Sequence, residues 1–118
     1  MVKEEYQWNI FWVNLDPSKG SEQAGTRPVL VVSTEAVNRF LPVITVLSIT
    51  SMKPGRKIYP TEVYLPQKAT GLDKESIAMT HQIRSISKER LGAVCGRIND
   101  PDLRDQIQET IKLYFGMS

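Results

Sequence analysis

The sequence predicts a mainly β fold, a small and strongly bent β-barrel with one helix packed on it. Short runs that are apolar, or that alternate polar with apolar residues, recur between positions 10 and 97 with turn residues between them. The last part of the chain instead repeats apolar residues at the spacing of an amphipathic helix. Because 118 residues suffice for one ordinary core, we expect a single domain over residues 1–118.

The first three strands follow from apolar runs. Residues 10–15 form a compact apolar run that ends in a turn signal, Asp-Pro, at residues 16–17. Residues 27–33 are rich in valine, and residues 43–49 are β-branched and nearly all apolar. We expect residues 50–57 to form a flexible polar connection after the third strand.

The later strands are shorter or less regular. Residues 61–65 alternate polar with apolar side chains, which is typical of a half-buried strand. Residues 76–79 and 82–86 are further strand, either continuous or bent at residues 80–81. Residues 93–97 form the last strand. We also expect short helical turns at residues 34–38 and 87–91 and a loop at residues 67–74.

The C-terminal segment has the clearest helical signals. Asn99 or Asp100 suits the N-cap, Pro101 suits the first turn, and Gly116 supplies a stop. Apolar side chains recur at spacings of four, four and three, which puts them on one face that we expect to pack on the core. These residues are Leu103, Ile107, Ile111 and Tyr114.

Composition excludes several classes of protein. Hydrophobic residues make up 41% and charged residues 24%, so disorder is not expected over most of the chain. No apolar run reaches the roughly 18 residues that a membrane helix needs, and the N-terminus lacks the layout of a secretion signal. The single cysteine, Cys95, cannot form an internal disulfide, which fits a reducing compartment. We therefore expect a soluble cytoplasmic protein without a membrane partner.

The net charge of only +2 means that the chain lacks the bulk basic surface of many nucleic-acid binders. Any phosphate binding must then come from a local patch. Lys53, Arg56 and Lys57 lie close together, and Lys19 and Arg27 flank the loop between the first two strands. The alternative is that these clusters are solvated surface.

That loop, residues 20–28, is the strongest candidate for a site. It places an acid, an amide, two glycines and an arginine at the mouth of an apolar strand. Glycine lets a backbone approach a ligand closely, and arginine supplies a rigid fork of donors that matches phosphate. Since binding residues are commonly found on loops held by a rigid scaffold, we expect an anion site here.

The loop and residues 12–19 before it resemble the opening signature of the MazF/PemK family of toxin endoribonucleases. The segment reads Trp-Val-Asn-Leu-Asp-Pro-Ser-Lys and continues Gly-Ser-Glu-Gln-Ala-Gly-Thr-Arg-Pro. Six or more matched positions at fixed spacing make this signal specific. The resemblance implies an SH3-like barrel that assembles as a homodimer.

The resemblance also implies a metal-independent, sequence-selective endoribonuclease that acts on single-stranded RNA without a cofactor. In such an enzyme the ribose 2′-hydroxyl attacks the adjacent phosphate and leaves 2′,3′-cyclic phosphate and 5′-hydroxyl ends. The implied partner is an antitoxin whose disordered tail covers the substrate groove, and DNA is contacted only through the antitoxin complex. One histidine and one cysteine also make a metal cluster implausible.

Three residues match the family's catalytic positions. Arg27 corresponds to the arginine that binds the scissile phosphate, although a strand-start arginine also pairs with surface carboxylates. Thr50 follows an apolar strand and would donate to a phosphate oxygen, although threonine ends strands routinely. Either Glu22 or Arg27 is the proton acceptor. If Glu22 is not, it orients Arg27 or is a solvated loop acid.

Further side chains are expected to bind RNA. Ser21 and Gln23 flank the loop acid, although such residues more commonly fix loops through local hydrogen bonds. The segment that begins at Gln82 resembles a second family block, which makes Gln82 and Arg84 substrate or dimer contacts. The expected substrate-binding set is Ser21, Gln23, Ser51, Lys53, Arg56, Lys57, Gln82 and Arg84.

Two positions depart from the family pattern. His81 stands where an acid usually precedes the glutamine, and Asn9 stands where the first strand usually opens with aspartate. Together with the modest net charge, Asn9 leaves a second hypothesis, a non-catalytic toxin on the same barrel that inhibits DNA gyrase by binding. The matches at Arg27 and Thr50 favour the ribonuclease.

Overall fold

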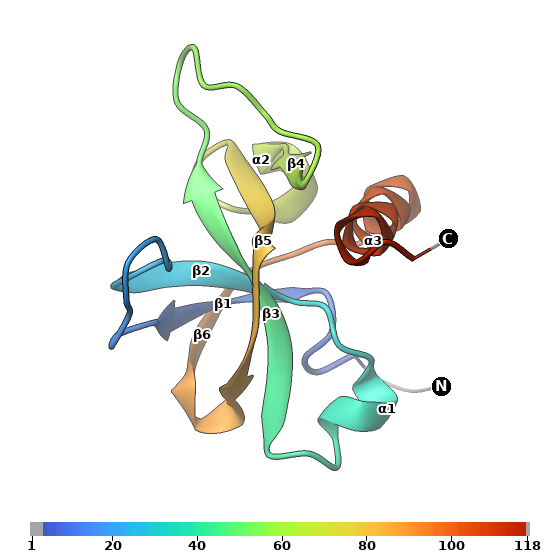
Figure 1. The fold of residues 1–118 in the computed structure, drawn as a ribbon. Coiled ribbons are helices and arrows are strands. Elements are labelled where there is room, and N and C mark those ends of the chain that lie inside the picture. The colour runs from blue at the N-terminus through green and yellow to red at the C-terminus, as the bar shows by residue number, and fades with distance from the viewer. Residues whose placement is uncertain (1–3, 118) are drawn as a thin grey trace.

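The computed structural model describes residues 4–117 (Figure 1). Six strands form one antiparallel sheet in the order β4-β5-β3-β2-β1-β6, so β4 and β6 are its edges. The strands are β1 (Asn9–Asn14), β2 (Thr26–Val31), β3 (Val43–Ser51), β4 (Glu62–Leu65), β5 (Ser76–Ser87) and β6 (Leu91–Arg97). The helices are α1 (Glu35–Asn38), α2 (Gln67–Thr70), the 3₁₀ turn η1 (Lys88–Arg90) and α3 (Pro101–Phe115). The predicted mainly β fold with a C-terminal helix is confirmed.

The sheet bends where its two longest strands lose register. β3 and β5 pair at both ends, but residues 80–83 of β5 face only Leu47 of β3. Such a bulge bends a strand and increases its twist. The two strand segments expected at residues 76–79 and 82–86 are therefore one continuous strand, bent at this bulge, which runs through the centre of Figure 1.

The sheet buries apolar side chains on both faces. Successive residues of a strand point to opposite faces, so Ile10 of β1 joins one core while Phe11 joins the other. α3 closes the first core with Leu103 and Ile107, which are 6% and 0% exposed. The sheet is thereby held as a rigid support for the loops at its ends.

α3 begins and ends as its sequence predicts. The side chain of Asp100 accepts a hydrogen bond from the backbone N–H of Asp102 at 3.1 Å, and Gly116 ends the helix in the left-handed conformation. The predicted apolar face is confirmed as far as Ile111, which packs partly buried on the core. It is wrong at Tyr114, a residue that is 42% exposed because the last turn extends past the core.

One strand boundary matters for the site. β3 continues to Ser51 instead of ending at residue 49, because its last two residues pair with β5. Thr50 therefore lies in the sheet and not in a flexible connection. The loop expected over residues 67–74 contains one short helix, α2, before the chain enters β5.

Candidate functional site

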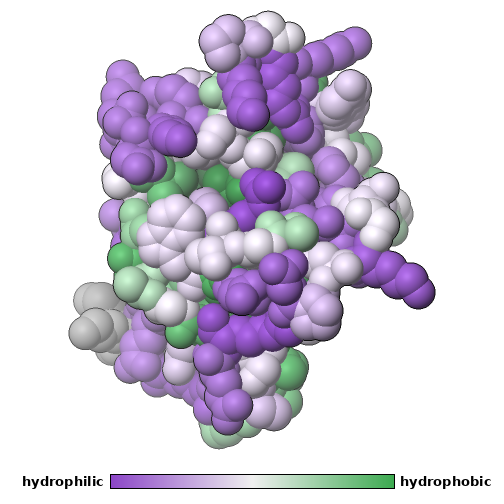
Figure 2. All heavy atoms as spheres, turned by 90° about the vertical axis from the view of Figure 1, so that its left-hand side faces the viewer, coloured by the Kyte–Doolittle hydropathy of each residue, from purple (hydrophilic) through white to green (hydrophobic). Residues whose placement is uncertain are grey.

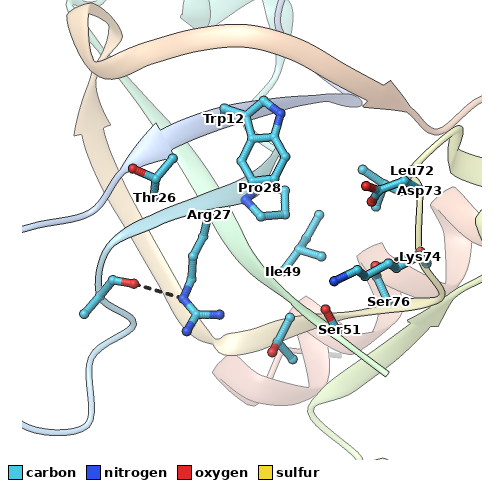
Figure 3. A pocket seen from close by; sticks show the side chains of 12 residues that line it. Trp12, Thr26, Arg27, Pro28, Ile49, Ser51, Leu72, Asp73, Lys74 and Ser76 are labelled. Atoms are coloured by element: carbon cyan, nitrogen blue, oxygen red, sulfur yellow. Dashed lines mark hydrogen bonds between the residues drawn. The ribbon is translucent and has the colours of Figure 1, made fainter. Parts of the chain in front are cut away.

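An open pocket lies where β2, β3 and the segment before β5 meet (Figure 3). Its volume is about 370 Å³, and both Arg27 and Thr50 line it. The sheet register explains this arrangement. Val29 of β2 pairs with Ser48 of β3, and continuing the same register by two residues places Arg27 opposite Thr50. The structure thus brings together the two side chains expected to bind the phosphate.

A local hydrogen bond fixes the direction of Arg27. Its Nε donates to the carbonyl of Ala24 at 2.9 Å (Figure 3). Within residues 4–117, none of the ion pairs includes this guanidinium, so it is not the surface-paired arginine of the alternative hypothesis. The two terminal nitrogens therefore remain for an anion in the pocket.

The pocket also contains polar residues that the sequence interpretation missed. Asp73 and Lys74 line it from the segment between α2 and β5, and Lys74 extends toward its centre in Figure 3. They arrive there because Ser76 at the start of β5 pairs with Ser51 at the end of β3. Their only sequence signal is a polar loop before a strand, which is too common to indicate a site.

Glu22 lies elsewhere. With Gln23 it lines a neighbouring pocket of about 250 Å³, whose other wall comes from Ser48 of β3 and residues 81–84 of β5. The Glu22 carboxylate accepts a hydrogen bond from the backbone N–H of Lys19. The predicted catalytic trio is therefore divided, with two members in the first pocket and Glu22 in the second.

The loop between β1 and β2 is held by a side-chain clamp. Nε2 of Gln82 donates to the carbonyl of Ser21 at 3.1 Å, and Oε1 of Gln82 accepts from the N–H of Gln23 at 3.3 Å. Ser18 adds a bond of 2.7 Å from its hydroxyl to the carbonyl of Gln23. Gln82 and Ser21, expected to touch RNA, thus have structural contacts of their own, and Arg84 lines the second pocket.

The basic cluster is not part of either pocket. Arg56 forms a two-pronged ion pair with Glu62, with nitrogen–oxygen distances of 3.0 and 2.8 Å, and its hydrogen bonds lower the pKa of that buried carboxyl. Lys53 lines a separate hollow beside Tyr64, and Lys57 is exposed. Arg56 therefore anchors the β3–β4 loop, while the two lysines face solvent.

The side of the molecule that carries the β1–β2 loop is mostly hydrophilic around a less polar hollow (Figure 2). In residues 4–117 no group of three or more His, Cys, Asp or Glu side chains is arranged to hold a metal ion. Burial raises the pKa of the Cys95 thiol, which favours its neutral form. Each helix of the same residues is too short or too polar to cross a membrane.

Known proteins match nearly the whole chain. Residues 6–115 match the family described as PemK-like, MazF-like toxin of type II toxin–antitoxin system. Endoribonuclease EndoA of Bacillus subtilis (strain 168) is 34% identical over 105 residues, or 89% of each chain. Endoribonuclease MazF9 of Mycobacterium tuberculosis is 39% identical over 113 residues, 92% of this chain and 93% of the relative. An endoribonuclease solved in complex with its cognate antitoxin, from a mycobacterial species, has a similar fold: TM-score 0.76, 19% identity and 96% coverage of both chains.

The open, bent barrel with its C-terminal helix is thus the fold of toxin ribonucleases. The chain belongs to the PemK-like, MazF-like toxin family, since the family match spans residues 6–115 and both curated relatives exceed 30% identity. Both relatives are endoribonucleases, and this chain is an enzyme of that class.

Proposed function

We propose that this toxin cleaves single-stranded RNA at selected sequences, by attack of a ribose 2′-hydroxyl on the adjacent phosphate, without a metal ion or cofactor. The observation that carries the proposal is the pocket shared by Arg27 and Thr50. A guanidinium and a hydroxyl that face one space suit a phosphate whose oxygens gain charge in the transition state. Base edges are accessible for reading when the RNA is unpaired.

The reaction balances on groups that line this pocket. The 2′ oxygen forms a bond to phosphorus and the bond from phosphorus to the 5′ oxygen breaks, which leaves a 2′,3′-cyclic phosphate and a 5′-hydroxyl. Arg27 and Thr50 stabilise the charged oxygens of the intermediate. Lys74 supplies the proton for the leaving 5′ oxygen, and a carboxylate accepts the proton of the 2′-hydroxyl.

Two carboxylates are candidates for the general base that accepts the proton of the 2′-hydroxyl. Asp73 lines the pocket itself, whereas Glu22 lines the neighbouring one and accepts a hydrogen bond from Lys19. A general base contributes about 10²- to 10⁴-fold, so we expect that loss of cleavage rate for Asp73→Asn and less than about tenfold for Glu22→Gln. The opposite ranking would return the role to Glu22.

The test of phosphate binding uses Arg27. We expect Arg27→Ala to lower kcat by about 10²- to 10³-fold with unchanged folding, as for loss of one transition-state donor. Arg27→Lys should remain impaired because lysine keeps the charge but lacks the fork. Thr50→Val should cost about 10- to 100-fold, the value of a hydrogen bond to a charged group. Lys112→Ala, on the exposed side of α3, is the matched control.

The chemistry of the step has its own test. An RNA with a single 2′-deoxynucleotide at the cleaved position should resist cutting at that position alone, and EDTA should leave the rate unchanged. Products from unmodified RNA should accept phosphate at their 5′ ends without prior dephosphorylation. Cleavage of the deoxy-substituted bond, or loss of activity in EDTA, would reject the proposed reaction.

The gyrase-binding hypothesis predicts a different outcome. Intact RNA together with inhibition of gyrase supercoiling would support it, and discrete RNA fragments would reject it. The ribonuclease relatives and the pocket of Arg27 and Thr50 both support the enzyme. Asn9, whose altered charge motivated the alternative, instead accepts a hydrogen bond from Arg97 at 3.0 Å at the far end of β1.

We also assign two protein partners to this toxin. A cognate antitoxin with an acidic disordered tail suits the cations Arg27 and Lys74, and the mycobacterial complex supports such a partner. A second copy suits the edge strand β6, where Val94 is 56% exposed. Co-purification with the product of the adjacent reading frame tests the first, and light scattering of the purified toxin tests the second. A free toxin from co-expression, or a monomer at micromolar concentration, would contradict them.

A further inference from the structure

One peptide group of the β1–β2 loop connects Arg27 to a carboxylate. The carbonyl of this group, at Ala24, accepts a hydrogen bond from Nε of Arg27 at 2.9 Å, which the dashed line in Figure 3 marks. Its N–H, at Gly25, donates to Oδ1 of Asp16 at 3.0 Å. Because the C=O and N–H of a planar trans peptide point in opposite directions, the carboxylate and the guanidinium bind opposite ends of one rigid unit.

The strand register explains why Asp16 reaches this peptide group. β1 and β2 pair as far as Asn14 and Thr26. The pairing continues by one residue beyond both strands, because the N–H of Leu15 donates to the carbonyl of Gly25 at 2.9 Å. Asp16 follows directly after this extension, so its side chain lies beside the N–H of Gly25.

Asp16 is itself held by two main-chain hydrogen bonds. Its N–H donates to Oδ1 of Asn14 at 2.9 Å, and its carbonyl accepts from Nη2 of Arg90 in η1 at 3.3 Å. Within residues 4–117, none of the ion pairs includes the Asp16 carboxylate. The hydrogen bond from Gly25 is therefore the contact that the folded chain gives this carboxylate.

The peptide group depends on this contact for its orientation. Gly25 has a φ of 77°, in a region where glycine moves among several conformations at little cost. Ala24 is exposed, so without Asp16 water would bind the N–H of Gly25 and the peptide plane would be free to rotate. Such a rotation would turn the Ala24 carbonyl away from Arg27.

The Ala24 carbonyl in turn fixes the guanidinium plane of Arg27. A hydrogen bond at Nε reduces the rotamers of the side chain and leaves its two terminal nitrogens for a phosphate. A carboxylate at the N–H end of the peptide also polarises the group, which strengthens its carbonyl as an acceptor. Ala24 and Arg27 line the pocket that contains Thr50, whereas Asp16 is not among the lining residues. Asp16 therefore acts on this pocket through the peptide group.

We propose that Asp16 is a positioning residue of this enzyme, which orients Arg27 toward the scissile phosphate through the Ala24–Gly25 peptide. The proposal deepens the ribonuclease function and rests on it. Asp16 neither touches the RNA nor transfers a proton; it raises the fraction of enzyme molecules in which Arg27 faces the phosphate. This role is distinct from that of the general base, for which Asp73 and Glu22 are the candidates.

The first experiment measures the orientation of Arg27 without RNA. The Nε–H of Arg27 gives its own NMR signal in isotope-labelled toxin, and Arg27→Lys identifies that signal by removing it. We expect hydrogen exchange at this Nε–H to be about five- to tenfold faster in Asp16→Ala, as for loss of one hydrogen bond. Asp16→Asn should exchange at the wild-type rate, because its amide oxygen replaces Oδ1 as the acceptor. Unchanged exchange in Asp16→Ala, or equal acceleration in both variants, would overturn the proposal.

The second experiment measures cleavage by variants that circular dichroism shows to be folded. We expect Asp16→Ala to lower kcat about five- to tenfold and Asp16→Asn to stay within about twofold of the wild type. Asp105→Ala, at an exposed aspartate of α3, is the matched control and should cut RNA at the wild-type rate. If Asp16→Asn lost as much activity as Asp16→Ala, the charge of Asp16 would act directly and the positioning role would be wrong.

A double-mutant cycle separates positioning from a general effect on the loop. Adding Asp16→Ala to Arg27→Ala should lower kcat by less than about twofold, because the group that Asp16 positions is already absent. A further loss as large as that of Asp16→Ala alone would show that Asp16 acts independently of Arg27, and the proposal would fail. A wild-type toxin that never cuts RNA would instead reject the ribonuclease, while the exchange rate at Arg27 would still decide whether Asp16 orients it.

Discussion

The ion pair between Arg56 and Glu62 provides a quantitative test of how the β3–β4 loop is held. The Glu62 side chain is 1% exposed, and its carboxylate accepts two hydrogen bonds from Arg56 and one from the N–H of Tyr59 at 3.0 Å. Arg56→Met keeps much of the aliphatic stem and removes the charge. The variant leaves a buried carboxylate with one backbone donor.

The size of the effect follows from this burial. Removing one partner of a buried pair costs about 3–5 kcal/mol, and we take about 3 kcal/mol because the Arg56 side chain is itself 27% exposed. Unfolding entropy of about 2.1 cal/mol/K per residue gives about 0.25 kcal/mol/K for 118 residues. A loss of about 3 kcal/mol therefore lowers Tm by about 12 °C.

The pH dependence has a definite sign. Arg56 holds the folded-state pKa of Glu62 below its ordinary value of 4.5, so the pair stabilises the protein above that value and the benefit is lost as pH falls through the lowered pKa. In Arg56→Met, burial instead raises the pKa of Glu62, and protonation relieves the cost. The stability gap between the two proteins should therefore be largest at pH 7 and shrink as pH falls below 5.

Urea unfolding at pH 7 and pH 4 measures both effects. Arg56→Met combined with Glu62→Gln should recover most of the loss, because no buried charge remains. A loss below about 1 kcal/mol at pH 7, the value of an exposed pair, would refute the reasoning. A gap of equal size at both pH values would show that the lost packing of Arg56, and not its charge, is responsible.

Three further predictions concern packing and the thiol. Ile107→Ala in α3, at a fully buried position, should lower the free energy of unfolding by about 2–5 kcal/mol, measured by urea unfolding. Leu113→Ala, at a position 59% exposed, should change it by no more than about 0.5 kcal/mol. Equal losses in the two variants would contradict the packing of α3. Gly96→Ala should lower the free energy of unfolding by about 1–3 kcal/mol, because the added Cβ would lie 2.7 Å from the carbonyl oxygen of Thr70. An unchanged Tm would show that β6 can shift to relieve this clash. Cys95 should react with a thiol reagent at pH 7 at least about tenfold more slowly in the folded protein than in urea, because its partial burial raises its pKa. Equal rates would rule out a half-buried neutral thiol.

Local signals explain why much of the fold was predictable. Alternation and apolar runs locate β1, β2 and β4, and the Asp100 cap and the Gly116 stop fix both ends of α3 without any tertiary information. The errors arise where residues far away in the sequence determine a strand end or the exposure of a side chain. The extension of β3 through Thr50 depends on β5, and the exposure of Tyr114 depends on how far the core extends beneath the helix.

The site residues also divide into those that the sequence indicates and those that only the folded structure brings into the pocket. Arg27 and the β1–β2 loop stand out because their residue types are unusual at the mouth of a strand, and the proximity of Arg27 and Thr50 follows from one antiparallel register. Asp73 and Lys74 carry no such signal. Their place in the pocket that Arg27 also lines depends on where the α2–β5 segment turns, which the spacing of residues does not encode.

The Gln82 clamp indicates how the two pockets depend on each other. Its amide holds Ser21 and Gln23, so it sets the position of the loop that lines both the pocket of Arg27 and Thr50 and the pocket of Glu22 and Gln23. Loss of this clamp would release Gln23 on one side and Ala24, the acceptor for Arg27, on the other. Gln82 would then influence the position of Arg27 although it does not line the pocket of Arg27 and Thr50, because both pockets share the loop that it fixes.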